Sequence, residues 1–112
     1  MTRRARARPL RAAPPPARLS WSHRARADLE AIGDYIARDD AAAAERWVMR
    51  IIAAAEKVVP TPLRGRRVPE VSRDDVREVL LRSYRIVYRV SPGQIQVLTV
   101  FEGHRLIVPT DE

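Results

Sequence analysis

Side chains suited to binding and acting on a phosphate group gather in the second half of this chain. A guanidinium holds a phosphate through paired hydrogen bonds, an imidazole transfers protons near neutral pH, and a carboxylate can act as a base. The residues of these types are Arg66, Arg67, Arg77, Glu78, Arg85, Tyr88, His104 and Arg105. We interpret the five arginines as candidate phosphate-binding residues, with Glu78 and His104 as candidate proton-transfer groups.

Most of these residues also have a purely structural interpretation. Arginines on a strand are typical of a solvated or ion-paired face, and the adjacent Arg66 and Arg67 are typical of a solvated loop. Tyr88 is in phase with apolar neighbours, which favours a place in the core, and His104 follows a glycine, which favours a turn. The sequence contains no glycine-rich phosphate loop, no hydrolase-like pair of carboxylates and no metal-ligand spacing, so we expect neither a metal nor a cofactor.

Three consecutive strands must position most of these side chains. A side-chain period of two, which a pleated strand produces, runs through residues 84–90. Tyr84, Ile86, Tyr88 and Val90 fall on one side, and Arg85, Val87 and Arg89 on the other. Residues 76–81 form the strand before it, and residues 94–101 form the strand after a turn at Ser91-Pro92-Gly93. In that last strand we expect Ile95, Val97, Thr99 and Phe101 on one side and Leu98 and Val100 on the other.

A first strand and two helices precede this meander. We predict a short strand at Arg18–Trp21 and then a helix that begins after its cap, Ser22, and ends near residue 38. The Asp39-Asp40 pair interrupts the pattern and caps a second helix, which covers residues 41–59 and carries an apolar stripe that includes Ile51 and Ala55. Residues 61–73 are expected to be a loop. The order predicts an α+β fold (β-α-α-β-β-β) in which an antiparallel helical hairpin packs on one face of the sheet.

Composition favours one domain with a separate N-terminal tail. The chain has 112 residues, 46% of them hydrophobic, which is enough for one core, and we place the domain at residues 18–112. Residues 1–17 are rich in arginine and proline without apolar periodicity, which predicts a disordered tail. We leave open whether this tail binds anions, has no role, or results from a start codon assigned too early. The absence of cysteine favours a reducing cytoplasm, and no apolar run is long enough to span a bilayer.

The positive charge is concentrated in the tail. The formal net charge is +7, but the first 20 residues contain six arginines and no acidic residue. The rest of the chain has fifteen basic and fourteen acidic residues and is therefore almost neutral. A nucleic-acid partner inferred from net charge alone would thus depend mainly on the tail.

A family resemblance runs through the same elements. Its main part is Ser83-Tyr84-Arg85-Ile86-Val87-Tyr88-Arg89, followed by Val97, Val100 and Gly103-His104-Arg105. Its upstream parts are Trp21-Ser22, Ala27-Asp28-Leu29, Ile32, Tyr35-Ile36, Gly65-Arg66-Arg67-Val68-Pro69-Glu70 and Val76-Arg77-Glu78. In this order, over residues 19–106, they resemble the RelE/ParE superfamily of bacterial toxins from type II toxin–antitoxin operons. The segments at 65–70 and 76–78 are similar to its ParE-like branch.

The RelE branch of this superfamily implies ribosome-dependent cleavage of mRNA. If the chain is such a nuclease, Arg85 and Arg105 match two arginines that stabilise charge at the scissile phosphate, and His104 or Glu78 would transfer protons. The sequence departs from the RelE pattern at two places. The strand before Tyr84 has one arginine and no lysine, and the C-terminal tyrosine of the pattern has no match in residues 106–112.

The resemblance to the ParE-like branch leads to our main hypothesis, a plasmid-stabilisation toxin that inhibits growth by binding DNA gyrase and has no nuclease site. One alternative is a ribosome-dependent endoribonuclease that acts on mRNA, and another is an inactive relative that only binds its antitoxin. In each case the family implies a cognate antitoxin, which would lay an acidic amphipathic segment along a groove or strand edge in a toxin–antitoxin hetero-oligomer. We expect no membrane partner.

Overall fold

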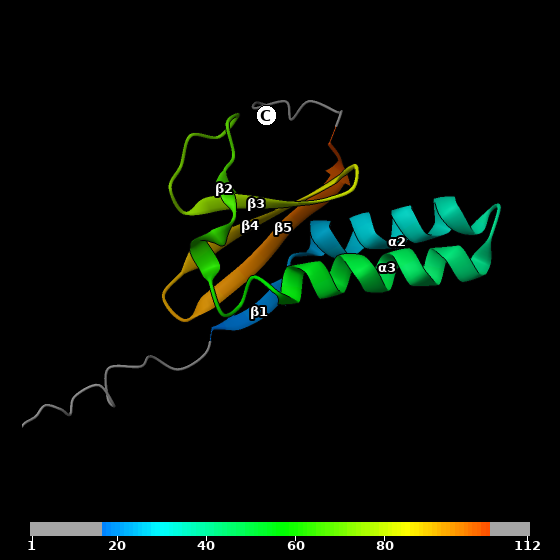
Figure 1. Ribbon diagram of the computed structural model, residues 1–112, viewed down its shortest axis with the longest axis horizontal. Coiled ribbons are helices and arrows are strands. Elements are labelled where there is room, and N and C mark those ends of the chain that lie inside the picture. The colour runs from blue at the N-terminus through cyan, green and yellow to red at the C-terminus, as the bar shows by residue number, and fades with distance from the viewer. Residues whose placement is uncertain (1–16, 104–112) are drawn as a thin grey trace, which may run out of the picture.

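The computed structural model describes residues 17–103, which form two helices, a short 3₁₀ helix and five strands (Figure 1). The order is β1 (Arg18–Trp21), α2 (His23–Ala37), α3 (Ala41–Glu56), the 3₁₀ helix η2 (Pro62–Arg64), β2 (Arg66–Arg67), β3 (Val76–Leu81), β4 (Tyr84–Ser91) and β5 (Gln94–Glu102). The predicted tail, apart from Ala17, lies outside the described residues. So do His104 and Arg105.

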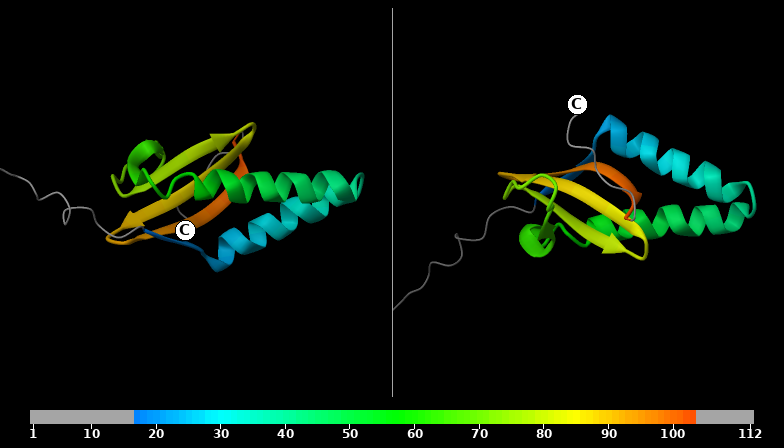
Figure 2. Two further views of the ribbon diagram at one scale, coloured as in Figure 1. Left: turned by 60° about the horizontal axis from the view of Figure 1, so that its bottom comes forward. Right: turned by 90° about the horizontal axis from the view of Figure 1, so that it is seen from above.

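The strands form one mixed sheet in the order β1-β5-β4-β3-β2. β1 runs parallel to β5, and β3, β4 and β5 form the predicted antiparallel meander. The hairpin of α2 and α3 packs on one face of the sheet, and its far end projects beyond the strands (Figures 1 and 2). The predicted α+β class and the placing of both helices on one face are therefore confirmed.

The predicted loop at residues 61–73 contains structure that the sequence did not indicate. Pro62–Arg64 forms η2, and Arg66 and Arg67 form β2, which pairs antiparallel with Glu78 and Arg77 of β3. The predicted β-α-α-β-β-β order is wrong in this respect, because the sheet has a fifth strand. Two residues are too short a run to show an alternating pattern, and their extended conformation depends on pairing with β3.

The helices begin at the predicted caps. The Ser22 hydroxyl accepts a hydrogen bond from the Ala25 amide at 3.0 Å, and the Asp40 carboxylate accepts one from the Ala43 amide at 3.0 Å. Both bonds satisfy first-turn donors that have no partner within the helix. The second helix ends at Glu56 and not at residue 59 as predicted. The chain turns over the residues before the proline at position 60, whose ring disfavours a helical conformation in the residue that precedes it.

The main core lies between the helical hairpin and the sheet. The side chains of Ile51 and Ala55 on α3 are buried, as the apolar stripe of that helix predicted. The buried residues of this layer are Ala25, Ile51, Ala55, Val58, Ile86, Tyr88, Ile95, Val97 and Val100. A smaller apolar cluster lies on the opposite face of the sheet, where Val68, Val76 and Val87 pack with Leu98 and Phe101.

A β-bulge in β5 changes the phase of its side chains. The register between β4 and β5 shifts between Val87 and Tyr88, which leaves Leu98 as the extra residue. Leu98 and Phe101 therefore pack in one cluster on the face away from the helices, whereas Val100 packs in the main core. The predicted strict alternation over residues 94–101 is wrong, because a sequence period of two does not reveal an inserted residue.

Polar side chains from the start of α2 hold this bulge. Ser22 Oγ donates a hydrogen bond to the Leu98 carbonyl at 2.9 Å. One carboxylate oxygen of Asp28 accepts bonds from Thr99 Oγ1 at 2.6 Å and from the Val100 amide at 3.0 Å. A bulge interrupts the ladder of hydrogen bonds between strands, so these contacts satisfy backbone groups at the interruption and fix α2 on the sheet.

Candidate functional site

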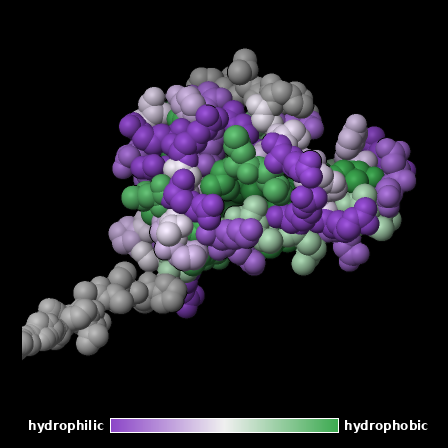
Figure 3. Space-filling view, viewed as in Figure 1, coloured by the Kyte–Doolittle hydropathy of each residue, from purple (hydrophilic) through white to green (hydrophobic). Residues whose placement is uncertain are grey.

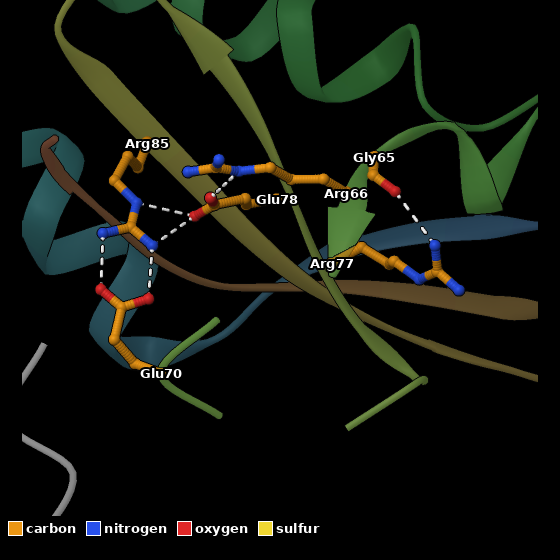
Figure 4. A network of polar contacts seen from close by, with 6 residues as sticks. All are labelled: Gly65, Arg66, Glu70, Arg77, Glu78 and Arg85. Carbon is orange, nitrogen blue, oxygen red and sulfur yellow. Dashed lines mark hydrogen bonds and ion pairs between the residues drawn. The ribbon is translucent and has the colours of Figure 1, made fainter. Parts of the chain in front are cut away.

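Arg85 of β4 and Glu78 of β3 lie next to each other on the face of the sheet away from the helices (Figure 4). Glu78 is directly opposite Val87 in the strand register, so Arg85 is its diagonal neighbour. Both side chains are buried, and that of Glu78 is 0% exposed. A carboxylate in such a place requires a charged partner with good hydrogen-bond geometry.

Two carboxylates hold the guanidinium of Arg85 (Figure 4). Its Nε and Nη2 atoms both lie 2.7 Å from Oε1 of Glu78. Its Nη1 and Nη2 atoms donate to the two carboxylate oxygens of Glu70, each at 2.9 Å. The ring of Phe101 lies beneath the guanidinium, with its centre 5.1 Å from Cζ. All three nitrogens of Arg85 are therefore engaged within the chain.

These contacts shift the pKa values of the groups involved. The hydrogen bonds from Arg85 lower the pKa of Glu70 to about 2, although desolvation acts in the opposite direction. The hydrogen bonds from Glu70 are the main reason that the pKa of Arg85 is raised, and Glu78 adds to this rise. Arg66 donates from Nε to the second oxygen of Glu78. Two cations and two carboxylates thus form a cluster with no net charge.

Tyr88 belongs to the core, as its phase in the strand predicted. Its hydroxyl donates to the Pro62 carbonyl at 2.8 Å and accepts from the Gly65 amide at 3.0 Å. Burial raises the pKa of Tyr88. A Cβ atom at position 65 would lie 2.6 Å from the Glu78 carbonyl oxygen, so only glycine fits there. Tyr88 and Gly65 together anchor the chain between η2 and β2 to the sheet.

The other arginines named from the sequence differ in their contacts. Arg77 donates to the Asp74 carboxylate at 2.8 Å, whereas Arg67 lies 3.9 Å from the same carboxylate. Arg66 is 58% exposed although its Nε is bound to Glu78. The structure therefore gathers Arg66, Glu78 and Arg85 in one cluster and leaves Arg67 and Arg77 outside it.

Glu70 is the member of the cluster that the sequence analysis did not name as a site residue. It lies in the connection between β2 and β3, where no periodic pattern indicates which side chains point inward. One signal could have indicated Glu70: an arginine on the apolar face of a strand needs acidic partners, and Glu78 alone does not satisfy all of its nitrogens. His104 and Arg105 lie outside the described residues, so their place in a site stays a prediction.

A groove runs between α3 and the outer edge of β3. Its lining residues are Arg50, Ala53, Ala54, Lys57, Arg64, Val79, Leu80 and Leu81. Leu80 is 58% exposed, and Figure 3 shows an apolar patch in the middle of this face bordered by hydrophilic side chains. Three lining residues are cationic and none is acidic. Within the described residues β2 pairs only with Arg77 and Glu78, so residues 79–81 have an open strand edge.

The chain matches a known protein family. The family model described as "ParE toxin of type II toxin-antitoxin system, parDE" matches residues 19–107. The chain belongs to this family. The resemblance to the RelE/ParE superfamily is thereby confirmed, and the protein is a toxin of a type II toxin–antitoxin system.

Individual relatives agree with this assignment. "Toxin RelE2" of Caulobacter vibrioides is 34% identical to the toxin over 90 residues, which cover 80% of this chain and 99% of that protein. "Putative toxin Y4kP" of Sinorhizobium fredii is 37% identical over 92 residues, which cover 79% and 90%. A chain of the chromosomal ParDE system from P. aeruginosa is 26% identical with a TM-score of 0.65, covering 77% of this chain and 95% of that one.

A more distant structure shares the fold alone. A chain of the toxin–antitoxin complex RelBE2 from Mycobacterium tuberculosis is 19% identical to the toxin, with a TM-score of 0.59 over 78% of this chain and 91% of that one. In residues 17–103 no helix is long and apolar enough to cross a membrane. Over the same range no group of three or more His, Asp or Glu side chains is placed to hold a metal ion.

Proposed function

We propose that this toxin inhibits growth by binding DNA gyrase, without cutting RNA, and that a cognate antitoxin neutralises it in the cytoplasm. The state of Arg85 is the observation that carries the proposal. A nuclease of the RelE type needs a cation that stabilises charge as it develops on the scissile phosphate. The guanidinium of Arg85 is already engaged at all three nitrogens by Glu70 and Glu78, and a cation so neutralised is a poor stabiliser of a further anion.

Two other candidate groups support a binding role in the same way. The carboxylate of Glu78, a candidate base, accepts from both Arg85 and Arg66 and has no exposed surface. The hydroxyl of Tyr88 is used inside the fold, where it bonds to Pro62 and Gly65. A nuclease would then depend on His104 and Arg105 without the help of these groups. This is less than general acid–base chemistry on a phosphodiester requires.

Ribosome-dependent cleavage of mRNA is the alternative function, since a relative with 34% identity is named Toxin RelE2. A toxin fold that retains only antitoxin binding is the third. Induced expression of the chain alone separates the three. We expect growth arrest with induction of the DNA-damage response and with continued protein synthesis. Immediate translation arrest without that response would support the ribonuclease, and unimpaired growth would support the inactive relative.

The structure also changes which variants are useful in this test. From the sequence alone, the Arg85→Ala variant would be expected only to remove a catalytic cation. In the folded protein it would leave the buried carboxylate of Glu78 with Arg66 as its remaining partner, and breaking a buried pair costs roughly 3–5 kcal/mol. Loss of toxicity in this variant would therefore report unfolding, so the wild-type chain must be the reagent that distinguishes the two targets.

We place the antitoxin in the groove between α3 and β3. An open strand edge accepts an extended segment through backbone hydrogen bonds, and exposed Leu80 offers an apolar contact beside it. The rim cations Arg50, Lys57 and Arg64 favour a segment that carries acidic side chains. The expected partner is therefore an acidic, partly apolar segment of the antitoxin encoded beside the toxin gene.

A charge reversal tests this placement. Lys57→Glu should weaken antitoxin binding, measured by titration calorimetry, by about tenfold or more because it places a like charge beside the acidic segment. Arg26→Glu is the matched control, since Arg26 is an exposed cation on α2 that does not line this groove. Equal affinities of the two variants would show that the antitoxin binds elsewhere.

A further inference from the structure

A second surface depression lies between α2 and the ends of β4 and β5, on the other flank of the helical hairpin from the groove between α3 and β3. Ile32, Tyr35 and Ile36 line it from α2, and Tyr84 lines it from the start of β4. The far end of the hairpin projects beyond the strands (Figures 1 and 2), and Tyr35 near that end is 69% exposed. A partner can therefore reach this depression from solvent.

Tyrosine and tryptophan side chains concentrate here. The chain has three tyrosines and two tryptophans. Tyr35 and Tyr84 line the depression, and the ring of Trp47 packs against that of Tyr84 with 5.8 Å between the ring centres. We call this place, defined by Tyr35, Trp47 and Tyr84, the aromatic cleft. Protein–protein interfaces and their hot spots are enriched in these residue types, so the composition of the cleft favours a protein ligand.

Two arginines stack on the rings of the aromatic cleft. Cζ of Arg38 lies 5.6 Å from the centre of the Tyr35 ring, and Cζ of Arg50 lies 4.7 Å from that of Trp47. Among residues 17–103 neither guanidinium has a carboxylate within ion-pair distance. A stacked guanidinium still offers the N–H groups of its edge to an anion. The complementary partner therefore presents acidic groups beside an apolar side chain.

The strand next to the aromatic cleft has no free edge for an added strand. In the described part of the chain, β1 pairs with β5 only over residues 94–97. Beyond them, Ser22 Oγ donates to the Leu98 carbonyl at 2.9 Å, and the Asp28 carboxylate accepts from the Val100 amide at 3.0 Å. An extended peptide would need these backbone groups. The cleft therefore suits the side chains of a folded protein surface, whereas the groove between α3 and β3 suits an extended segment.

The aromatic cleft and the groove meet on α3. Arg50 lines the groove and stacks on Trp47, whose ring packs against Tyr84 in the cleft. An antitoxin segment that binds beside Arg50 thus lies next to the cleft, where it would obstruct the approach of a large folded protein. Occupation of the groove and occupation of the cleft should exclude each other.

We infer that the aromatic cleft is the surface through which the toxin binds gyrase, with Tyr35 as the central contact and Arg38 beside it. This inference rests on the proposed function. It adds which face of the toxin meets a folded surface of the enzyme, and it explains how an antitoxin in the neighbouring groove prevents that contact.

Removal of the exposed ring tests the inference. In Tyr35→Ala, the toxin concentration that gives half-inhibition of supercoiling by purified gyrase should rise at least about tenfold. Its Tm and its affinity for the antitoxin, measured by titration calorimetry, should equal those of the wild type. Met49→Ala is the matched control, because Met49 is another exposed apolar residue of the hairpin (60%) and lines neither surface. Tyr35→Phe keeps the ring and should inhibit nearly as well as the wild type.

Two arginine variants test the overlap of the surfaces. Arg38→Ala should weaken gyrase inhibition without changing antitoxin affinity, since Arg38 stacks on Tyr35 and does not line the groove. Arg50→Glu should weaken both, because Arg50 belongs to both surfaces.

Every other result overturns the inference. Inhibition of gyrase by Tyr35→Ala at wild-type strength does so while leaving the gyrase proposal intact. A parallel loss of antitoxin affinity in Tyr35→Ala would assign the cleft to the antitoxin, and a wild-type dimer that Tyr35→Ala dissociates would assign it to a second copy of the chain. If the wild-type toxin leaves supercoiling unchanged, the proposed function and this inference fail together.

Discussion

Replacement of Asp28 by alanine should destabilise the toxin far more than an ordinary helix-surface substitution. One carboxylate oxygen of Asp28 accepts from Thr99 Oγ1 at 2.6 Å and from the Val100 amide at 3.0 Å, across the bulge of β5. Val100 is buried, with 2% exposure, so water does not replace the lost acceptor at its amide. Hydrogen bonds to a charged group contribute roughly 1.5–3 kcal/mol each, and a buried donor without a partner costs a similar amount.

The expected loss for Asp28→Ala is therefore about 3 kcal/mol in the free energy of unfolding, which corresponds to a fall in Tm of about 12 °C or more for a domain of this size. Urea denaturation followed by circular dichroism measures the first quantity directly. Arg24→Ala is the matched control, because it removes the exposed ion pair of Asp28 with Arg24 at 3.0 Å and leaves both bonds to β5 intact. Its cost should stay below about 0.5 kcal/mol.

Asp28→Asn gives a finer test of the same account. The amide keeps one oxygen acceptor in nearly the same place but loses the charge, so its stability should lie between those of the wild type and Asp28→Ala. If Asp28→Ala unfolds at the same urea concentration as Arg24→Ala, the bonds to the bulge contribute nothing. The idea that α2 fixes the irregular part of β5 would then be refuted.

Three further predictions follow from packing and charge. Ile51→Ala should cost about 2–5 kcal/mol in urea denaturation, because the side chain is fully buried, whereas exposed Glu56→Ala should stay within about 0.5 kcal/mol. Gly65→Ala should lower Tm and weaken the contact with Tyr88, since its Cβ would lie 2.6 Å from a backbone oxygen. The pKa of Glu70 is lowered to about 2, so its stabilising pair is complete above the ordinary value of 4.5 and is lost as the pH falls toward 2. Stability measured over this acid range should fall less steeply in Glu70→Gln than in the wild type.

The sequence allowed good prediction of the elements that depend on local patterns. The period of two in residues 84–90 predicted which side chains of β4 face the helices, and Tyr88 and Ile86 are in the core as expected. Ser22 and Asp40 cap the two helices, because the hydroxyl and carboxylate of such residues satisfy first-turn amides wherever a helix begins. These signals lie within a few residues of the structure they specify.

The features that the sequence did not indicate depend on contacts between distant segments. β2 is extended because it pairs with β3, and its two residues carry no pattern of their own. The bulge at Leu98 is held by α2, more than 70 positions away in the chain. Glu70 binds Arg85 from a connecting segment that has no periodic pattern. The sequence therefore indicated Arg85 as a site residue but did not indicate Glu70 as its second counter-ion. Long-range pairing decided each of these cases.

The ion pairs of Arg85 show that contacts between distant segments also decide what a candidate site residue can do. Arg85 was named as a phosphate-binding residue from its type and from the resemblance to the RelE branch. The structure surrounds it with Glu70 and Glu78, and a residue type indicates what chemistry is available but not which partner already uses it. The distinction between a nuclease and a binding toxin therefore rests on these two carboxylates.

Supercoiling of plasmid DNA by purified gyrase, with the wild-type toxin added, tests the central claim most directly. We expect the toxin to block supercoiling or to trap cleaved DNA, to lose this effect when the cognate antitoxin is added, and to leave mRNA on purified ribosomes uncut. Unchanged supercoiling together with codon-specific cuts in ribosome-bound mRNA would contradict the account and establish the ribonuclease instead.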